Sequence, residues 1–247
     1  MMKYGLIFLS LILTVNTAYA KCEDEAAAGV NWTGCDKSGL DLSSVNLKSA
    51  ILRRVNFTGT NLSNARMQDA DLSFSILENT NFSQARMERS RINNAKISNS
   101  KFPQAILDEA RLSRSNIQST DFSNSRINKA NFYEAKIKDS FFKKAQLNSA
   151  DFTGAKITKG NFEEATAEAA LFNRADLEAA NFSKASLKAA KFEEANLIDV
   201  LFTESNLSEA SIRDAIIDGA IFNGAKLDST TWVRYQRCRN GSVGVCK

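Results

Sequence analysis

The sequence contains no histidine and only one proline among its 247 residues. Because histidine is the commonest general base and the commonest metal ligand, its absence excludes histidine-dependent catalysis. Tryptophan and cysteine are scarce, with two and four residues, whereas phenylalanine is abundant with 16. Since 43% of the residues are hydrophobic, the chain has enough apolar material for one or two folded domains and is not expected to be disordered.

No apolar run after residue 20 approaches the length that spans a bilayer, but residues 1–20 resemble a secretory signal peptide. Lys3 precedes an apolar stretch of about 12 residues, which ends in Ala18-Tyr19-Ala20, a typical cleavage site. Lys21, and not a small residue, precedes Cys22, so attachment of a lipid is not expected. The sequence therefore predicts export to the periplasm or the medium, with cleavage after Ala20 and no transmembrane segment in the mature chain.

The body of the chain, residues 38–232, is an uninterrupted repeat of five residues. The last residue of each block, from Leu42 to Trp232, is Leu, Ile, Met, Phe or Trp, and Ala167 is the one departure. Two residues earlier in each block lies Ala, Ser, Thr or Val, except at Leu40 and Gly160. Two registers kept in phase over this length identify a repeat architecture.

The period of five excludes the two common regular structures. Residues five apart on an α-helix differ by about 140° after a full turn, so the large residues would spread around the helix. On a straight strand they would point alternately to opposite sides, because side chains alternate with period two. The inward residues instead recur at spacings of two and then three, which predicts one short side followed by one tight corner in each block.

Writing the sequence in rows of four blocks separates the large residues into four columns. Two columns are largely aliphatic, and the other two are rich in phenylalanine and lie two blocks apart. The longer aromatic column contains Phe82, Phe102, Phe122, Phe142, Phe162, Phe182, Phe202 and Phe222, and the shorter one contains Phe132, Phe152, Phe172 and Phe192. Alternation by two blocks also fits a two-sided coil, but the unequal lengths of the aromatic columns favour four sides. Like residues would then stack at the strand spacing of about 4.8 Å.

The blocks Ala70-Asp71-Leu72, Ala130-Asn131-Phe132 and Ala180-Asn181-Phe182 resemble the A(D/N)LXX consensus of the pentapeptide-repeat family. This resemblance implies an all-β fold, a right-handed quadrilateral β-helix of about ten coils and roughly 45 Å in length. The expected organisation is a signal peptide at 1–20, an N-terminal cap at 21–37, the β-helix at 38–232 and a C-terminal cap at 233–247. Ala167 is expected to leave a packing defect in its coil unless a neighbouring phenylalanine leans in.

All four cysteines flank the repeat, where a solenoid needs covers for its exposed ends. Bridged cysteines require Cα atoms within about 7 Å, so ends roughly 45 Å apart cannot be joined. The expected disulfides are therefore Cys22–Cys35 and Cys238–Cys246, each within one cap. The same distance excludes one metal site of four thiolates, and a redox-active pair lacks the C-x-x-C spacing. Trp32 and Trp232 are expected as apolar lids, although a surface binding role is an alternative.

Only outward residues remain as functional candidates, because the repeat fills the interior. Between residues 51 and 160 there are 18 basic and 10 acidic residues, whereas between 161 and 210 there are 4 basic and 10 acidic. The densest basic group is the candidate binding surface for an anionic partner, and ordinary solubilising charge is the alternative, since acids lie between its members. Its members are Arg86, Arg89, Arg91, Arg111, Arg114 and Arg126. Outward apolar residues could serve a partner or self-association: Phe141, Leu171, Leu201, Ile216 and Ile221.

The sequence therefore predicts a non-enzymatic exported scaffold that binds an unidentified protein or envelope polymer through its outer faces. No catalytic residue, cofactor or metal is expected, and a homo-oligomer remains possible. The net charge is too small to indicate direct binding of nucleic acid. The alternative rests on the family resemblance: some members mimic DNA with acidic surfaces and bind type II topoisomerases such as gyrase. Here only residues 161–210 are acidic, and export would separate the chain from that target.

Overall fold

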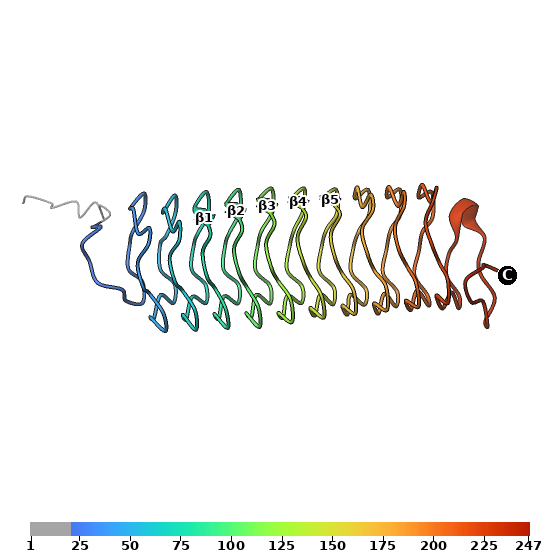
Figure 1. Cartoon of the computed structure of the whole chain (residues 1–247), viewed down its shortest axis with the longest axis horizontal. Helices are drawn as coiled ribbons and strands as arrows, with labels where there is room; N and C mark the ends of the chain where they lie inside the picture. The colour runs from blue at the N-terminus through green and yellow to red at the C-terminus, as the bar shows by residue number, and fades with distance from the viewer. Residues whose placement is uncertain (1–20) are drawn as a thin grey trace, which may run out of the picture.

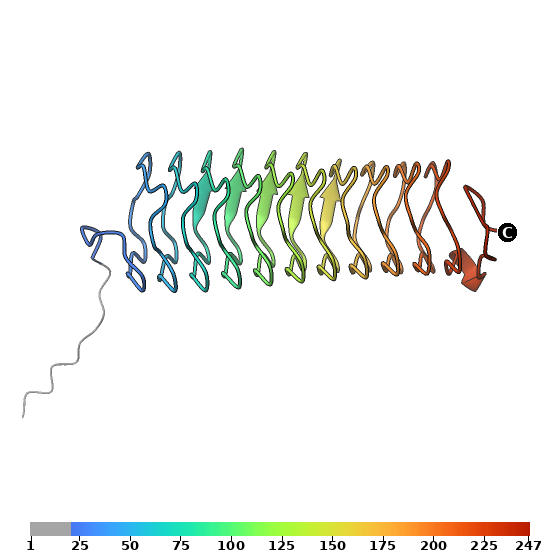
Figure 2. The ribbon, with the colours of Figure 1, turned by 90° about the horizontal axis from the view of Figure 1, so that it is seen from below.

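The computed structural model describes residues 21–247, and the expected signal peptide lies outside the described residues. Figures 1 and 2 show a straight rod of stacked coils with the two ends of the repeat at opposite ends of the rod. Each coil contains four blocks of the repeat, because Asn61 forms a parallel bridge with Asn81, and Asn81 with Lys101. The expectation of an all-β solenoid with stacked coils is confirmed.

Each coil is hydrogen-bonded to the coils before and after it through its backbone. The Leu62 amide donates to the Asn81 carbonyl at 2.7 Å, and the Asn81 amide donates back to the Thr60 carbonyl at 3.0 Å. Between these short sides, a turn is closed where the Ala65 amide donates to the Leu62 carbonyl at 3.1 Å. The second turn residue, Asn64, has a φ of 58°, as a type II turn requires.

The four walls are numbered here in chain order by the large residue that each buries. The first wall contains Phe82, the second Met87, the third Ile92 and the fourth Ile97, and each position recurs once in every coil. Strands occur in the fourth wall, where they form a five-stranded parallel sheet in the order β1-β2-β3-β4-β5. They are β1 (Ile76–Glu78), β2 (Lys96–Ser98), β3 (Asn116–Gln118), β4 (Lys136–Lys138) and β5 (Lys156–Thr158). The neighbouring strands run side by side in Figure 2.

Two stacks of phenyl rings form the centre of the rod. In the first wall, consecutive rings from Phe82 to Phe222 lie 4.6–5.6 Å apart between centroids. In the third wall, Phe132 stacks on Phe152 at 4.6 Å. The two stacks meet edge to face, with centroids 5.5–6.4 Å apart, which is a favourable geometry for aromatic pairs.

Three residues depart from the repeat pattern: Leu40 and Gly160 at the small position and Ala167 at the large one. At Gly160 a Cβ atom would lie 2.6 Å from Ile157 Cγ2 and 2.9 Å from Phe162 Cε2, so even alanine would clash. Leu40 remains 44% exposed, so its bulk does not have to fit inside the rod. Ala167 is completely buried in the second wall.

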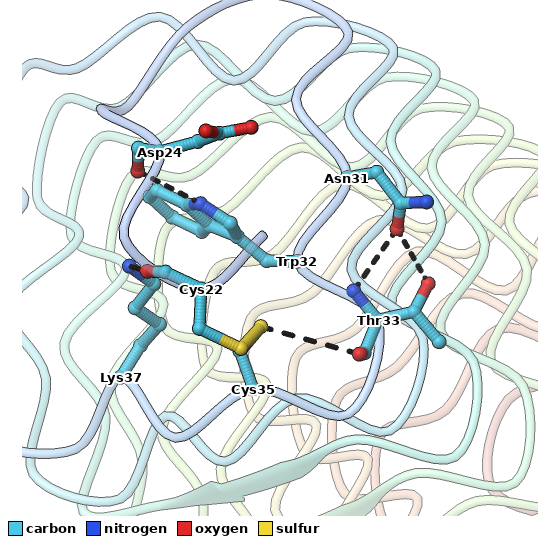
Figure 3. Close-up of a disulfide and its surroundings, with 7 residues drawn as sticks. All are labelled: Cys22, Asp24, Asn31, Trp32, Thr33, Cys35 and Lys37. Atoms are coloured by element: carbon cyan, nitrogen blue, oxygen red, sulfur yellow. Dashed lines mark hydrogen bonds between the residues drawn. A yellow bond between two sulfur atoms is a disulfide. The ribbon is translucent and has the colours of Figure 1, made fainter. Parts of the chain in front are cut away.

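The N-terminal end is covered by a disulfide-bonded loop (Figure 3). Cys22 and Cys35 are bonded as expected, with Cα atoms 5.5 Å apart. The buried Trp32 indole donates to the Asp24 carbonyl at 3.1 Å. The Lys37 ammonium lies 3.9 Å from the centroid of the Trp32 ring and donates to the Cys22 carbonyl at 2.6 Å. Lys37 therefore stands at the start of the fourth-wall column, in which later coils have an aliphatic or aromatic residue.

The regular coil begins before Ser38, inside the segment expected as a cap. Asn31 already pairs with Ile51 in parallel, and Trp32 occupies the large inward position. The sequence frame did not include this stretch because Lys37 stands where an apolar residue was expected.

The C-terminal end is covered by an antiparallel return of the chain. Lys226 pairs with Val243 and Thr231 with Arg237, so these two sides of the last coil gain backbone partners. The short 3₁₀ helix η1 (Val233–Tyr235) leads into this return. The disulfide of the C-terminal cap joins Cys238 and Cys246, with Cα atoms 4.9 Å apart. The partly buried Trp232 packs on the Phe222 ring, with centroids 4.9 Å apart.

Candidate interaction surface

The outward residue that precedes each large inward residue has a structural role when it is Asp or Asn. The side-chain oxygen of Asp71 accepts a hydrogen bond from the backbone amide of Ser73 at 3.1 Å. That of Asn81 accepts one from the backbone amide of Ser83, also at 3.1 Å. In this way the side chain satisfies the first amide of the turn, which would otherwise lack a partner within the coil. The position is therefore not free to bind a ligand in these coils.

At two of the positions where arginine replaces Asp or Asn, a neighbouring coil accepts the hydrogen bond of the turn amide. Arg111 and Arg126 stand in place of Asp or Asn. The Ser113 amide donates to Asn93 Oδ1 at 3.2 Å, one coil below. In the same way, the amide of Asn128 donates to the coil below, to an oxygen of Asp108, at 3.0 Å. The turns after Arg111 and Arg126 therefore do not depend on the arginine side chains.

Five of the six arginines of the candidate basic surface form ion pairs, mostly between coils. The nitrogen–oxygen distances are 2.8 Å for Arg86–Glu88, 2.8 Å for Arg89–Asp69, 3.2 Å for Arg91–Asp71, 2.8 Å for Arg114–Glu134 and 2.6 Å for Arg126–Asp108. Exposed pairs of this kind contribute little to stability, because water and salt screen them. The Arg111 side chain is exposed and forms no ion pair or hydrogen bond among the residues described. The structure therefore leaves one arginine of the group free to bind an anion.

The pKa shifts show no carboxyl group prepared as a general acid. The carboxyl groups with a shifted pKa are Asp36, Asp41, Asp69, Asp71, Glu134 and Glu163, and each pKa is lowered. A hydrogen bond from Arg89 lowers the pKa of Asp69, and one from Arg114 lowers that of Glu134. Burial raises the pKa of Asp71, but hydrogen bonds from Ser73 and the charge of Arg91 outweigh it. These groups stay ionised near neutral pH, as structural ion pairs do.

Two adjoining hollows lie on the third wall and its corners, and both include Arg111. They have volumes of about 500 Å³ and 600 Å³. The first is lined by Asp69, Arg89, Arg91, Glu109, Arg111, Lys129 and Asn131, and the second by Asn93, Asn94, Arg111, Ser113, Arg114, Asn131 and Tyr133. We refer to the two together as the third-wall hollow. It contains more basic than acidic groups, which suits an anionic or polar partner.

The third-wall hollow brings together four of the six predicted arginines. Arg86 and Arg126 lie outside it, in the outward column of the second wall. Sequence reasoning missed the hollow's Lys129, Asn131 and Tyr133, although they fall beside Arg111 when the sequence is written in rows of four blocks. The outward apolar residues Phe141, Leu201, Ile216 and Ile221 are exposed but line neither hollow, and Leu171 is half-buried.

Within residues 21–247, no group of three or more Asp, Glu or Cys side chains could hold a metal ion. Over the same residues, no helix is long and apolar enough to cross a membrane.

These features define the chain as a four-sided β-solenoid with a solid core and an outer surface available for binding. Comparison with protein families identifies which solenoid it is. A model described as a pentapeptide repeat region matches residues 95–172. A second, described as pentapeptide repeats in eight copies, matches residues 28–59, 41–73, 65–104, 161–197 and 195–231. The chain belongs to the pentapeptide-repeat family, as the sequence resemblance predicted.

The solved structure of HetL shows the same fold. HetL, a pentapeptide repeat protein involved in regulating heterocyst differentiation in the cyanobacterium Nostoc sp., is 24% identical, with a TM-score of 0.63. The match covers 81% of this chain and 90% of HetL. QnrB1, a plasmid-mediated fluoroquinolone resistance protein, is 18% identical, with a TM-score of 0.45, over 81% of this chain and 95% of its own. The likeness to HetL shows the fold alone, and that to QnrB1 carries no argument. A search of curated protein sequences finds no match.

Proposed function

We propose that this protein is a non-enzymatic exported scaffold that binds another macromolecule through its outer faces. The observation that carries the proposal is the third-wall hollow, where Arg111 is exposed, unpaired and released from its turn by Asn93. The solid aromatic core supports the same function, because it leaves the outer surface as the place for a partner. A protein or an envelope polymer with acidic groups fits this surface.

Export rests on two features of different kinds. The leader pattern of residues 1–20 is the sequence signal. The two disulfides indicate an oxidising compartment, since such bonds are rare where thiols are kept reduced. We therefore assign the mature scaffold to the periplasm or the medium.

DNA mimicry remains the second candidate, because residues 161–210 carry 10 acidic and 4 basic residues. Several of these acids are paired with lysines or arginine of neighbouring coils. The pairs include Glu163–Lys143 at 2.9 Å, Glu164–Lys144 at 3.5 Å, Glu204–Lys184 at 4.0 Å and Glu193–Arg213 at 2.8 Å. These pairs reduce the negative charge of the stretch, whereas a DNA mimic needs a continuous negative potential, so the scaffold function is favoured.

The test is affinity capture from an envelope extract with matched charge reversals. Arg111→Glu changes the third-wall hollow, and Arg126→Glu makes the same change on the second wall. We expect Arg111→Glu to weaken retention of the partner about tenfold, while Arg126→Glu changes it less than about twofold. Equal losses, or no retained partner, would count against the proposal. Inhibition of supercoiling by purified gyrase would support DNA mimicry instead.

A further inference from the structure

Apart from the third-wall hollow, a separate hollow lies on the fourth wall. It is a depression of about 180 Å³ over β3, β4 and β5. Its lining contains three lysines, an amide and a hydroxyl, and no carboxylate: Asn116, Lys136, Ile137, Lys138, Lys156 and Thr158. Figure 2 shows the strands that carry it lying side by side. We call it the lysine hollow.

The register of the sheet brings the three lysines together. Lys136 on β4 pairs directly with Lys156 on β5, so their side chains are neighbours on the same face. Lys138 lies two residues further along β4 and therefore projects from the same face. Ile137, between them, points into the core and is buried. Three lysine side chains thus line one hollow on this face.

This arrangement is unfavourable for the protein alone. Like charges directly opposite each other on neighbouring strands repel. Lys136 and Lys138 form no ion pair among the described residues, and Lys156 reaches the Asp176 carboxylate at 3.8 Å. The nearest acid in the chain, Asp139, follows Lys138 in the turn but forms no ion pair with it. By contrast, Lys143 faces Glu163 of the neighbouring coil at 2.9 Å. An anion from outside would compensate the charge here.

The donors favour a phosphate group over a carboxylate. Lysine acts as a point charge with three donors and binds phosphate readily, whereas planar carboxylates are matched best by the fork of arginine. The Asn116 amide and the Thr158 hydroxyl can supply further hydrogen bonds to phosphate oxygens.

The shape of the site favours a phosphate that is held at a surface. A hollow of about 180 Å³ is smaller than the pockets that enclose soluble ligands, which measure about 300–1,000 Å³. The turn after β4 leads within three residues of Lys138 to Phe141, which lies on the adjoining first wall and is 48% exposed. Basic groups and an exposed aromatic side chain on the two sides of one corner are typical of peripheral membrane contact, where both charge and apolar burial contribute.

We propose that the lysine hollow binds the phosphate of an anionic lipid headgroup, with Phe141 inserted from the adjoining first wall, so that the corner between these two walls lies against a membrane surface. The site involves the fourth wall and does not depend on Arg111 or on the third-wall hollow.

Co-sedimentation with vesicles tests this proposal. The oxidised protein is mixed with vesicles of phosphatidylglycerol and phosphatidylcholine, or of phosphatidylcholine alone. We expect binding to the anionic vesicles alone, weakened by added salt and by pyrophosphate. The double variant Lys136→Gln/Lys138→Gln should weaken binding about tenfold. The control Lys184→Gln/Lys188→Gln removes the same charge from two lysines paired with Glu204 and Glu209, and should change binding less than about twofold.

A third variant separates a lipid from a soluble phosphate compound. Phe141→Ser should weaken vesicle binding several-fold, while binding of pyrophosphate, measured by calorimetry, stays the same. Absence of binding to anionic vesicles, or equal losses in the two lysine double variants, would overturn the proposal. Binding of pyrophosphate without binding of vesicles would overturn the lipid assignment and leave a soluble phosphate ligand. Circular dichroism confirms that each variant keeps the fold.

Discussion

At the scale of the residue, the repeat consensus has Asp or Asn because this side chain accepts a hydrogen bond from the first backbone amide of the turn. Where the residue is Asp71 or Asn81, its side chain accepts that amide within the same coil. Where it is Arg111, Thr166 or Lys191, the turn amide donates instead to an asparagine of the coil below. The acceptors are Asn93, Asn148 and Asn173 respectively. In these three blocks, the departure from the consensus is thus compensated one coil earlier in the chain.

This exchange predicts that Asn93→Ala destabilises the protein although Asn93 does not match the consensus position. The partly buried amide of Ser113 would lose its acceptor, which costs about 1 kcal/mol. Thermal unfolding should show a lower melting temperature. Asn93→Asp keeps the acceptor and should unfold close to the original protein.

Asn223→Ala is the matched control for Asn93→Ala. Asn223 occupies the same position within its block in a later coil and is exposed, without a side-chain hydrogen bond in the described structure. Its replacement should leave the melting temperature almost unchanged. If Asn93→Ala behaves in the same way, water replaces the amide acceptor and the explanation is wrong.

At the scale of the coil, stability depends on filling four inward columns with side chains of the right size. Ala167 replaces the large residue in the second wall, between Leu147 and Leu187 of the adjacent coils. Ala167→Leu should restore the missing side chain and stabilise the protein by about 2 kcal/mol, the value of burying three more carbon atoms. A higher melting temperature is the expected result.

Ala165→Leu is the corresponding test at the position of the block where the repeat has a small residue. Ala165 is fully buried two residues before Ala167. A leucine there should overpack the coil and lower the melting temperature. A fall with both variants would show that the neighbouring phenylalanines already occupy the space beside Ala167.

At the scale of the whole molecule, ion pairs join successive coils along the rod and make stability depend on pH. Hydrogen bonds from Arg89, Arg114 and Lys143 lower the pKa values of Asp69, Glu134 and Glu163. The ordinary pKa values are 3.8 for Asp and 4.5 for Glu, so the unfolded chain takes up protons first as the pH falls. The contribution of these pairs is complete above about pH 5 and is lost as the pH falls through the lowered values.

The melting temperature should therefore be constant between pH 7 and 5 and fall steadily between pH 5 and 3. The combined variant Arg89→Gln/Arg114→Gln should start lower and fall less steeply, because two of the three carboxyl groups lose their partners. Unfolding followed by circular dichroism at each pH measures both curves. An unchanged slope in the variant would show that other carboxyl groups control the acid transition.

The sequence by itself determined the coil, its four walls, the aromatic stacks and the pairing of the cysteines. These features follow from a pattern that recurs in every block and again in every fourth block, so each coil supports the same conclusion. The sequence did not show that the coil begins at Asn31, because Lys37 interrupts the apolar frame and is accommodated by Trp32 and the Cys22 carbonyl.

Only the tertiary structure decided which charges on the rod are free. The sequence identified a basic group, yet five of its six arginines are paired, largely with carboxylates of the neighbouring coil. Rows of four blocks place Lys136 beside Lys156, but only the structure shows that these lysines and Lys138 line one hollow without a carboxylate. Long polar side chains choose their partners among several neighbours by distance and direction in space, and a repeating pattern of apolar residues does not encode that choice.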